Sequence, residues 1–199
     1  MFGRKASRPA SDSLDWHVDF IADLARLLRP GVYVELGIFQ AELFNRVAPF
    51  AELAIGLDID PASARYVRRA PNVEFICGTT DSFVSEMLDR DLVIDMLFID
   101  ADHSRESVLA DFRNYFPFVR PQGLILLHDT HPGNEGLTDA GWCGDAYRAI
   151  EELQRNADEY EMMTIPRSPG LTMCRKRTAQ LSWMEPPVTD RASGGCATP

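Results

Sequence analysis

The clearest fold signal is the stretch FIDADHSRESVLADFRNYFPFVRPQGLILLHDTH, which occupies residues 98–131. An apolar run at 95–99 leads into it, apolar residues recur at helical spacing over 104–116, and a second apolar run covers 124–127. Short, nearly continuous apolar runs are typical of strands that are covered on both faces. Strand, helix and strand in this order predict two parallel strands joined by a right-handed crossover.

The same alternation extends along the rest of the chain. Further strands are predicted at 32–36, 53–57 and 73–76, and helices at 12–28, 40–48, 61–69, 81–89 and 145–157. Two last runs, at 161–165 and 171–175, are separated by prolines and a glycine and predict a hairpin. The predicted fold class is α/β: a Rossmann-like, doubly wound sheet of seven strands, mostly parallel, with an antiparallel closing strand.

Length and composition predict one globular domain, expected over residues 12–177. With 199 residues and 45% apolar content, the chain can bury one sizeable core. Residues 1–11, rich in Ser, Arg and Pro, are predicted to be a flexible tail. Residues 178–199, rich in Pro and Gly, are predicted to be disordered.

Charge and apolar patterning disfavour several classes of partner. Thirty acidic and 20 basic side chains give a formal charge of -10, which disfavours nucleic acid because phosphate binding needs clustered Lys and Arg. No run approaches the roughly 18 apolar residues of a membrane span, and no apolar signal core follows the basic N-terminus. Four unevenly spaced cysteines fit a reduced, cytoplasmic setting. A small-molecule partner is expected, and a homo-oligomer is left open.

The residues that follow the predicted strands indicate the function, because ligands of such sheets bind at the carboxyl ends of the strands. The first strand ends at Glu35 and Gly37, but Phe39 stands where a dinucleotide-binding loop needs its second glycine. A dinucleotide is therefore disfavoured. Asp58 ends the second strand and is suited to bind the hydroxyls of an adenosyl ribose. The turn 78–81 offers polar groups for an adenine edge.

Together these residues resemble the class I S-adenosylmethionine-dependent methyltransferases, in the small-molecule O-methyltransferase branch of catechol-type and macrolide-sugar-type enzymes. The resemblance covers residues 30–176. It implies S-adenosylmethionine as the cofactor, with its methionine part near Gly37, its ribose on Asp58 and its adenine near Thr80. The predicted cofactor-binding residues are Glu35, Gly37, Phe39, Asp58, Ile59, Thr80, Asp81 and Asp100.

The loop after the first strand departs from the family pattern. The family often has two more glycines there, and this chain has Phe39 and Ala41 at those positions. The geometry of the cofactor loop is therefore an open question at the level of sequence.

Polar residues after the fourth and fifth strands point to the chemical step. A hydroxyl acceptor must lose its proton, and His103, with Asp100 nearby, matches the position of a general base in the macrolide-sugar enzymes. In the metal-dependent members of the family, the positions of Asp100, His128 and Asp129 bind magnesium. The imidazole of His128 would suit a softer divalent metal better than magnesium.

Other polar or aromatic residues receive simpler interpretations. His17 is interpreted as a helix-face residue, Asp102 as a helix cap and His131 as a loop residue in water. The glycine-rich segment 132–144 is long enough to be a binding loop, and its Trp142 is a candidate wall or lid.

The predicted function is methyl transfer from S-adenosylmethionine to a hydroxyl of a small molecule, such as a sugar or a phenolic natural product. One alternative is a differently specialised Rossmann-like domain that binds another nucleotide. A second alternative is a non-catalytic domain that kept the fold. Binding of S-adenosylhomocysteine or of NAD would distinguish the three.

Overall fold

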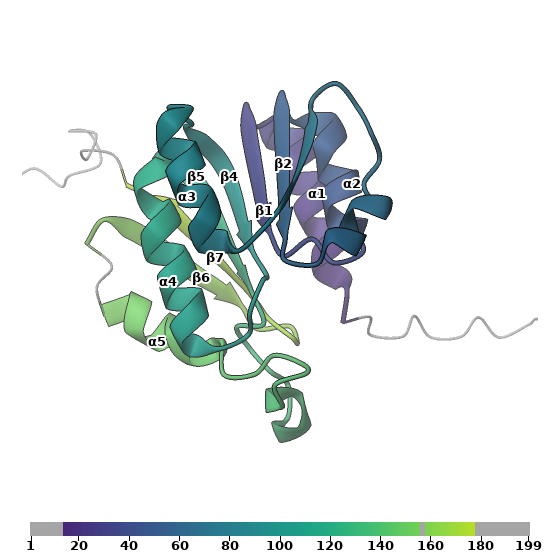
Figure 1. The fold of residues 1–199 in the computed structure, drawn as a ribbon. Helices are drawn as coiled ribbons and strands as arrows, with labels where there is room; N and C mark the ends of the chain where they lie inside the picture. The colour runs from purple at the N-terminus through teal and green to yellow at the C-terminus, as the bar shows by residue number, and fades with distance from the viewer. Residues whose placement is uncertain (1–13, 156–157, 178–199) are drawn as a thin grey trace, which may run out of the picture.

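The computed structural model describes residues 14–155 and 158–177, which form one seven-stranded sheet between two layers of helices (Figure 1). The strands are β1 Val32–Leu36, β2 Leu53–Asp58, β3 Val73–Cys77, β4 Ile94–Ile99, β5 Val119–His128, β6 Tyr160–Ile165 and β7 Leu171–Lys176. The helices are α1 Trp16–Leu28, α2 Glu42–Val47, α3 Thr80–Asp89, α4 Arg105–Tyr115 and α5 Tyr147–Arg155.

The strand order is β3-β2-β1-β4-β5-β7-β6, and only the pairs that involve β7 are antiparallel. The predicted fold class is therefore confirmed, including the closing hairpin. None of the helices in the described part of the chain is long and apolar enough to cross a membrane.

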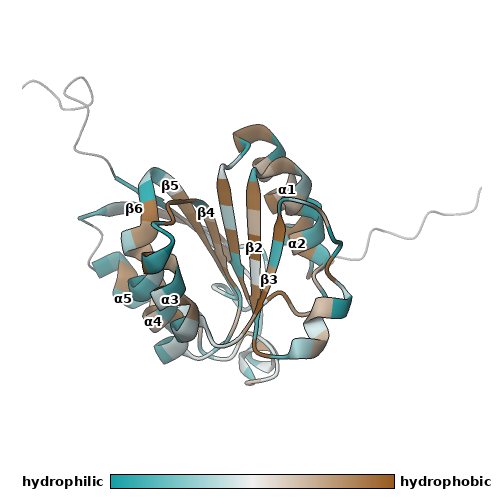
Figure 2. Cartoon of the chain, turned by 45° about the horizontal axis from the view of Figure 1, so that its top comes forward, coloured by the Kyte–Doolittle hydropathy of each residue, from teal (hydrophilic) through white to brown (hydrophobic). Residues whose placement is uncertain are grey.

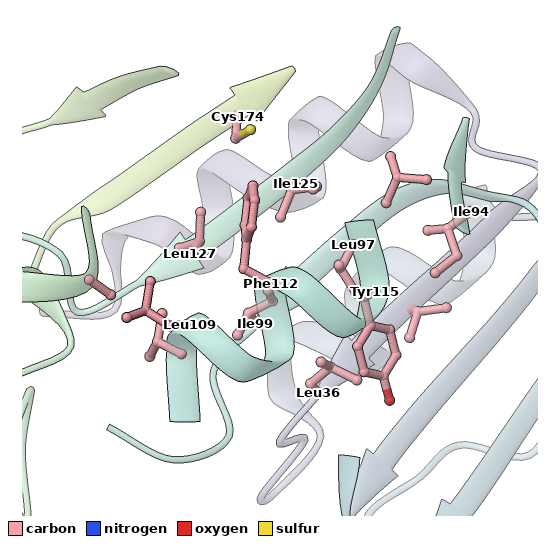
Figure 3. Packing of buried hydrophobic residues seen from close by; sticks show 14 of the residues in the cluster. Leu36, Ile94, Leu97, Ile99, Leu109, Phe112, Tyr115, Ile125, Leu127 and Cys174 are labelled. Carbon is pink, nitrogen blue, oxygen red and sulfur yellow. The ribbon is translucent and has the colours of Figure 1, made fainter. Parts of the chain in front are cut away.

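Alternate residues of the strands feed two apolar cores, one on each face of the sheet. Leu36 and Leu127 pack with Phe112 of α4 in the core under α3, α4 and α5 (Figure 3). Phe98 packs with Ile21 of α1 in the core under α1 and α2. The strands are hydrophobic along most of their length, whereas the helices mix hydrophobic and hydrophilic residues (Figure 2). Each fully buried large apolar side chain contributes about 1.5–3 kcal/mol.

The predicted helix at 61–69 is wrong beyond its first turns, because the structure has only a short 3₁₀ helix, Pro61–Arg65. Asp60 caps this helix by accepting a hydrogen bond from the backbone N–H of Ala62. A second proline, Pro71, disfavours helical backbone in the residue before it, so the chain extends toward β3. The predicted tails, 1–11 and 178–199, and the predicted start of the first helix lie outside the described residues.

The centre of the sheet is the point where the crossovers diverge. β1 pairs with β2 on one side and with β4 on the other, so the loops that follow β1 and β4 run to opposite sides. Gly37 follows β1 and Asp100 follows β4, and the backbone N–H of Asp100 donates to the carbonyl of Leu36 at 2.9 Å. Loops that separate at a switch point leave a crevice at the carboxyl ends of the strands.

Candidate active site

A cavity of ≈ 860 Å³ lies at this end of the sheet. Its volume falls within the roughly 300–1,000 Å³ of small-molecule sites. All the predicted site residues except Glu35 and Asp81 line it, namely Gly37, Phe39, Asp58, Ile59, Thr80, Asp100, His103, His128 and Asp129. The topology thus brings residues from the ends of five strands, β1 to β5, to one cavity.

Gly37 allows the backbone of the first loop to lie directly on the loop after β4. Its φ of +84° falls in the left-handed region, and a Cβ there would lie 2.2 Å from the carbonyl oxygen of Asp100. Phe39 and Ala41 also adopt positive φ, 46° and 55°, at the positions where the family often has glycine. The loop therefore has left-handed backbone at all three positions although only one is glycine, at an expected cost of about 1–2 kcal/mol for each non-glycine residue.

Asp58 stands at the cavity wall with its carboxylate fixed by backbone donors. Oδ2 accepts from the N–H of Phe39 at 2.7 Å, and Oδ1 accepts from the N–H of Asp60 at 2.8 Å. These bonds join the end of β2 to the first loop. Ile59 is 72% exposed and Phe39 is 73% exposed, so both present apolar surface at the rim of the cavity.

The turn before α3 lines the part of the cavity where the sequence predicts the adenine. Gly78, Thr79 and Thr80 line it, and Thr79 caps α3 through its hydroxyl. Asp81 is on α3 and accepts a hydrogen bond from Nδ2 of Asn114 on α4, away from the cavity lining. Its assignment as a cofactor contact stays a prediction.

Glu35 is buried within the sheet and does not line the cavity. The hydroxyl of Tyr33 donates to its Oε2 at 2.5 Å. Burial raises the pKa of Glu35 to about 8. The hydrogen bond from Tyr33 lowers the pKa, and the negative charge of Asp100 raises it further. The side chain is therefore a neutral acid near pH 7, and its predicted place beside the cofactor stays a prediction.

Glu35→Gln is expected to flatten the dependence of stability on pH. The folded wild type holds a proton that the unfolded chain releases near pH 4.5, so its stability is full below pH 4.5 and falls as pH rises to about 8. We expect a slope of roughly 0.5–1 kcal/mol per pH unit in that window, below the limit of about 1.4 for a fully held proton. Urea unfolding at pH 5, 6, 7 and 8 measures it. The exposed residue Glu151 provides the control, as Glu151→Gln, and an equal slope in Glu35→Gln and wild type would contradict the assignment.

His103 lies between two carboxylates at the other end of the cavity. Its Nε2 is 3.6 Å from Oδ1 of Asp100, its Nδ1 is 3.3 Å from Oδ2 of Asp129, and Nδ1 also contacts the carbonyl of Trp142. The hydrogen bond with Asp100 raises the pKa of His103 to about 9. Burial lowers this pKa, and the negative charge of Asp129 raises it. A base at this position works through the fraction of imidazole that has lost its proton.

Asp100 is the residue that the two histidines share. Nδ1 of His128 donates to Oδ1 of Asp100 at 3.0 Å. Burial acts to raise the pKa of Asp100, but the charges of and hydrogen bonds with His128 and His103 hold it well below its usual range. Asp100 is therefore an anion at neutral pH.

Sequence reasoning missed His17 as a member of this cluster. α1 brings it beneath the cavity, where its ring lies 3.9 Å from the ring of His128 between centroids. The missed signal is its spacing: His17 precedes Ile21 by four residues and so lies on the apolar stripe of α1. Two groups of three residues each bring potential metal-ligand atoms within 4.8 Å of one another. One group is His17, Asp100 and His128, and the other is Asp100, His103 and Asp129.

The glycine-rich segment 132–144 contributes to the cavity wall next to His103. Leu137, Gly141, Trp142 and Cys143 line the cavity, and Trp142 is 55% exposed. Burial raises the pKa of the Cys143 thiol to about 12, with the charge of Asp129 adding to the shift, so the thiol stays protonated.

The wall of the cavity is acidic. Five aspartates line it, Asp15, Asp58, Asp100, Asp102 and Asp129, while no lysine or arginine among the described residues does so. Such a wall favours a ligand that carries positive charge and disfavours a phosphate.

Comparisons with known proteins bear on what this cavity binds. Residues 34–130 match the family model of a methyltransferase domain. Over 55 residues, the chain is 36% identical to an uncharacterized protein of Sinorhizobium fredii, a match that spans 27% of this chain and 6% of that protein.

Solved structures of low sequence identity share the fold. One is the O-methyltransferase from Bacillus cereus in complex with S-adenosylhomocysteine, with a TM-score of 0.68, 16% identity, and coverage of 85% of this chain and 84% of that chain. Another is the O-methyltransferase TomG from Streptomyces achromogenes, involved in tomaymycin synthesis and in complex with S-adenosylmethionine, with a TM-score of 0.66, 19% identity, and coverage of 81% and 80%.

Proposed function

We propose that the chain is an S-adenosylmethionine-dependent O-methyltransferase that methylates a hydroxyl of a small molecule, as the sequence predicts. The match of residues 34–130 to a methyltransferase domain and the fold shared with solved O-methyltransferases support this proposal. The observation that carries the proposal is the division of one cavity between two sets of groups. Asp58 and Thr80 lie at the end suited to an adenosyl group, and Asp100, His103 and Asp129 lie at the end suited to an acceptor.

The adenosyl half has the donors and acceptors that a nucleoside needs. The Asp58 carboxylate faces the cavity with both oxygens already held by N–H groups, so its position is fixed before a ligand arrives. Carboxylate oxygens accept hydrogen bonds from the two ribose hydroxyls. S-adenosylmethionine supplies a methyl group on a positively charged sulfur, which the acidic wall stabilises.

The acceptor half can hold and remove a proton. Nδ1 of His103 contacts the Trp142 carbonyl, so this nitrogen carries an N–H. Nε2 faces Asp100, and it accepts the acceptor's proton in the fraction of His103 that has lost its own Nε2 proton. Asp100 and Asp129 orient the ring and stabilise the imidazolium that forms. Trp142 and its neighbours shield the cavity, which limits competition from water.

The predicted metal ligands Asp100, His128 and Asp129 lie together, but His128 is hydrogen-bonded to the two carboxylates. Nδ1 of His128 is 3.0 Å from Asp100 and 3.4 Å from Asp129, so it donates to these carboxylates and leaves only Nε2 for a metal. A divalent cation on the carboxylates would lower the pKa of an acceptor hydroxyl. Asp100 and Asp129 orient His103 whether or not a cation is bound.

The test of the proposed function has two parts. Isothermal titration of the full chain with S-adenosylhomocysteine is expected to give micromolar binding, with no binding of NAD. A screen of phenols, sugars and hydroxy acids for production of S-adenosylhomocysteine then identifies the acceptor class. Absence of S-adenosylhomocysteine binding would overturn the cofactor assignment, and methylation of amines or thiols alone would overturn the hydroxyl assignment.

Asp58→Ala is expected to weaken S-adenosylhomocysteine binding about 10- to 150-fold, because about 1.5–3 kcal/mol is lost with charge-assisted hydrogen bonds to the ribose. Isothermal titration measures the dissociation constant. The matched control is Asp60→Ala, two residues along, which removes a carboxylate that caps the 3₁₀ helix and does not line the cavity. An unchanged dissociation constant in Asp58→Ala would remove Asp58 from the site.

His103→Gln is expected to lower turnover about 10²- to 10⁴-fold, the usual range for loss of a general base. Affinity for S-adenosylhomocysteine should stay within a few-fold of wild type, because the adenosyl half of the cavity is unchanged. Steady-state kinetics with the best acceptor of the screen and titration of the ligand measure the two effects. Full turnover in the variant would eliminate His103 as the base.

A further inference from the structure

Asp145 joins the cavity wall to the start of α4 without lining the cavity itself. Its Oδ1 accepts from the backbone N–H of Arg105, the first residue of α4, at 2.7 Å. Its own backbone N–H donates to the carbonyl of His103 at 3.1 Å. One residue therefore binds the backbone on both sides of Ser104, directly beside the proposed base.

Asp145 is itself held in place from the side of α5. Ala146 is buried in the core under α4 and α5, and α5 begins at Tyr147. The carbonyl of Asp145 accepts from the backbone N–H of Arg148 at 2.9 Å. The carboxylate is thus presented to α4 from a fixed point of the fold.

Gly144 brings the wall and the backbone of His103 into direct contact. Its φ of +54° lies in the left-handed region, and a Cβ there would lie 2.4 Å from the carbonyl oxygen of His103 and 3.2 Å from its Cβ. Glycine meets both requirements, because it tolerates this backbone and needs no space for a side chain. Two consecutive residues, Gly144 and Asp145, therefore hold the wall against His103.

The chain before Gly144 forms a compact turn, which we call the wall turn and define as residues 137–144. The backbone N–H groups of Trp142 and Gly144 both donate to the carbonyl of Asp139, at 2.9 and 3.1 Å. The N–H of Cys143 donates to the carbonyl of Leu137 at 2.9 Å. Because these bonds close the turn on itself, loss of its anchor is expected to displace it as a unit.

The wall turn supplies two things to the acceptor half of the cavity. The carbonyl of Trp142 contacts Nδ1 of His103, which orients the imidazole ring. The side chain of Trp142 lines the cavity. Displacement of the turn would release the ring and open the cavity next to it.

We propose that Asp145 is a positioning residue for the methyl transfer, because its carboxylate holds the wall turn on α4 and so keeps Trp142 against His103. This inference rests on the proposed function. Asp145 acts through the backbone and touches neither cofactor nor acceptor. A carboxylate suits the place, since a charged acceptor gives a stronger hydrogen bond and negative charge is favourable at the start of a helix.

A simple helix cap is the competing role for Asp145, and Ser104 provides the control for it. Ser104 is the N-cap of α4, and its hydroxyl accepts from the backbone N–H of Ser107 at 3.3 Å. Ser104 does not line the cavity. Ser104→Ala therefore removes a side-chain cap from the same helix without loosening the anchor of the wall turn.

The first test compares the kinetics of the full-length variants with the best acceptor of the screen. Asp145→Ala is expected to lower kcat about 10- to 100-fold, because small displacements of catalytic groups have effects of this size. The KM for S-adenosylmethionine should stay within about threefold of wild type, because the adenosyl half is unchanged. Asp145→Asn keeps an oxygen acceptor for the N–H of Arg105 and should recover most of the lost kcat. Ser104→Ala should keep kcat within about threefold of wild type.

Three outcomes of the kinetic test would overturn the positioning role. Equal losses of kcat in Asp145→Ala and Ser104→Ala would make Asp145 an ordinary cap of α4. Wild-type kcat in Asp145→Ala would show that the anchor does not serve catalysis. A rise in the KM for S-adenosylmethionine that matches the fall in kcat would indicate general damage to the cavity.

The second test reads the anchor without turnover. Hydrogen exchange followed by mass spectrometry is expected to show amides of the wall turn exchanging at least tenfold faster in Asp145→Ala than in wild type, with wild-type rates in Ser104→Ala and in β2 of both variants. Unchanged exchange of the wall turn in Asp145→Ala would overturn the proposal. Faster exchange there, in a wild-type background that neither binds S-adenosylhomocysteine nor methylates an acceptor, would overturn the proposed function and leave the anchor standing.

Discussion

Gly37→Ala is expected to lower the free energy of unfolding by about 4 kcal/mol, the sum of left-handed strain and overpacking in a place that cannot relax. The added Cβ would lie 2.2 Å from the carbonyl oxygen of Asp100 and 2.6 Å from Cα of Ala101. Both are backbone atoms at the end of β4, so neither can turn aside. Relief of the clash requires the ends of β1 and β4 to move apart, which also moves Asp100. Affinity for S-adenosylhomocysteine is therefore expected to fall in the same variant.

Urea unfolding monitored by circular dichroism measures the first effect, and isothermal titration measures the second. Gly141→Ala is the matched control for stability, because a Cβ on Gly141 would meet no atom within 4 Å. A loss of less than about 1 kcal/mol in Gly37→Ala, which is ordinary for an alanine at a compatible site, would show that the two loops do not pack as described.

The sequence predicts the sheet well because its signals are local. Most strands are short apolar runs that follow a turn. Because parallel strands place the residues that end them at one edge of the sheet, the sequence predicts that Asp58 and Asp100 lie in one cavity, and both line it. The prediction of a helix at 61–69 is wrong because helix propensity does not show how soon the chain must extend toward β3. The left-handed backbone of Phe39 and Ala41 is equally hidden, since neither residue type favours it.

The candidate site could be predicted only in part. The sequence predicts most of the cavity residues that follow strand ends, but it does not predict that Glu35 is buried. Because successive side chains of a strand point to opposite faces, a shift of one residue decides which of the two cores a side chain enters. Leu36 packs under α4, so Glu35 must face the other side, where Tyr33 covers it. His17 belongs to an element far away in sequence, and only the packing of α1 against β4 and β5 brings it to His128. A histidine within an apolar helical stripe is the signal to watch for.

Asp100→Asn is expected to lower turnover about 10³-fold, within the range for loss of a general base, although its own carboxylate is not the proposed base. Asp100 is the shared acceptor of both histidine contacts, from Nδ1 of His128 at 3.0 Å and from Nε2 of His103 at 3.6 Å. Asparagine has nearly the same shape, so packing is preserved, but its neutral amide neither holds the two rings in place nor stabilises the imidazolium that forms when His103 takes a proton. Turnover with the best acceptor measures the effect.

The comparison with Asp102→Asn separates this role from a general effect of charge. Asp102 lines the same cavity two residues along and accepts a hydrogen bond from the backbone N–H of Ser104, so its loss removes one negative charge without touching either histidine contact. A much smaller loss of turnover is expected there. Equal losses in the two variants would mean that the acidic wall as a whole, rather than the Asp100 contacts, drives catalysis. Wild-type turnover in Asp100→Asn would overturn the assignment of His103 as well, because the base would then work without the carboxylate that orients it.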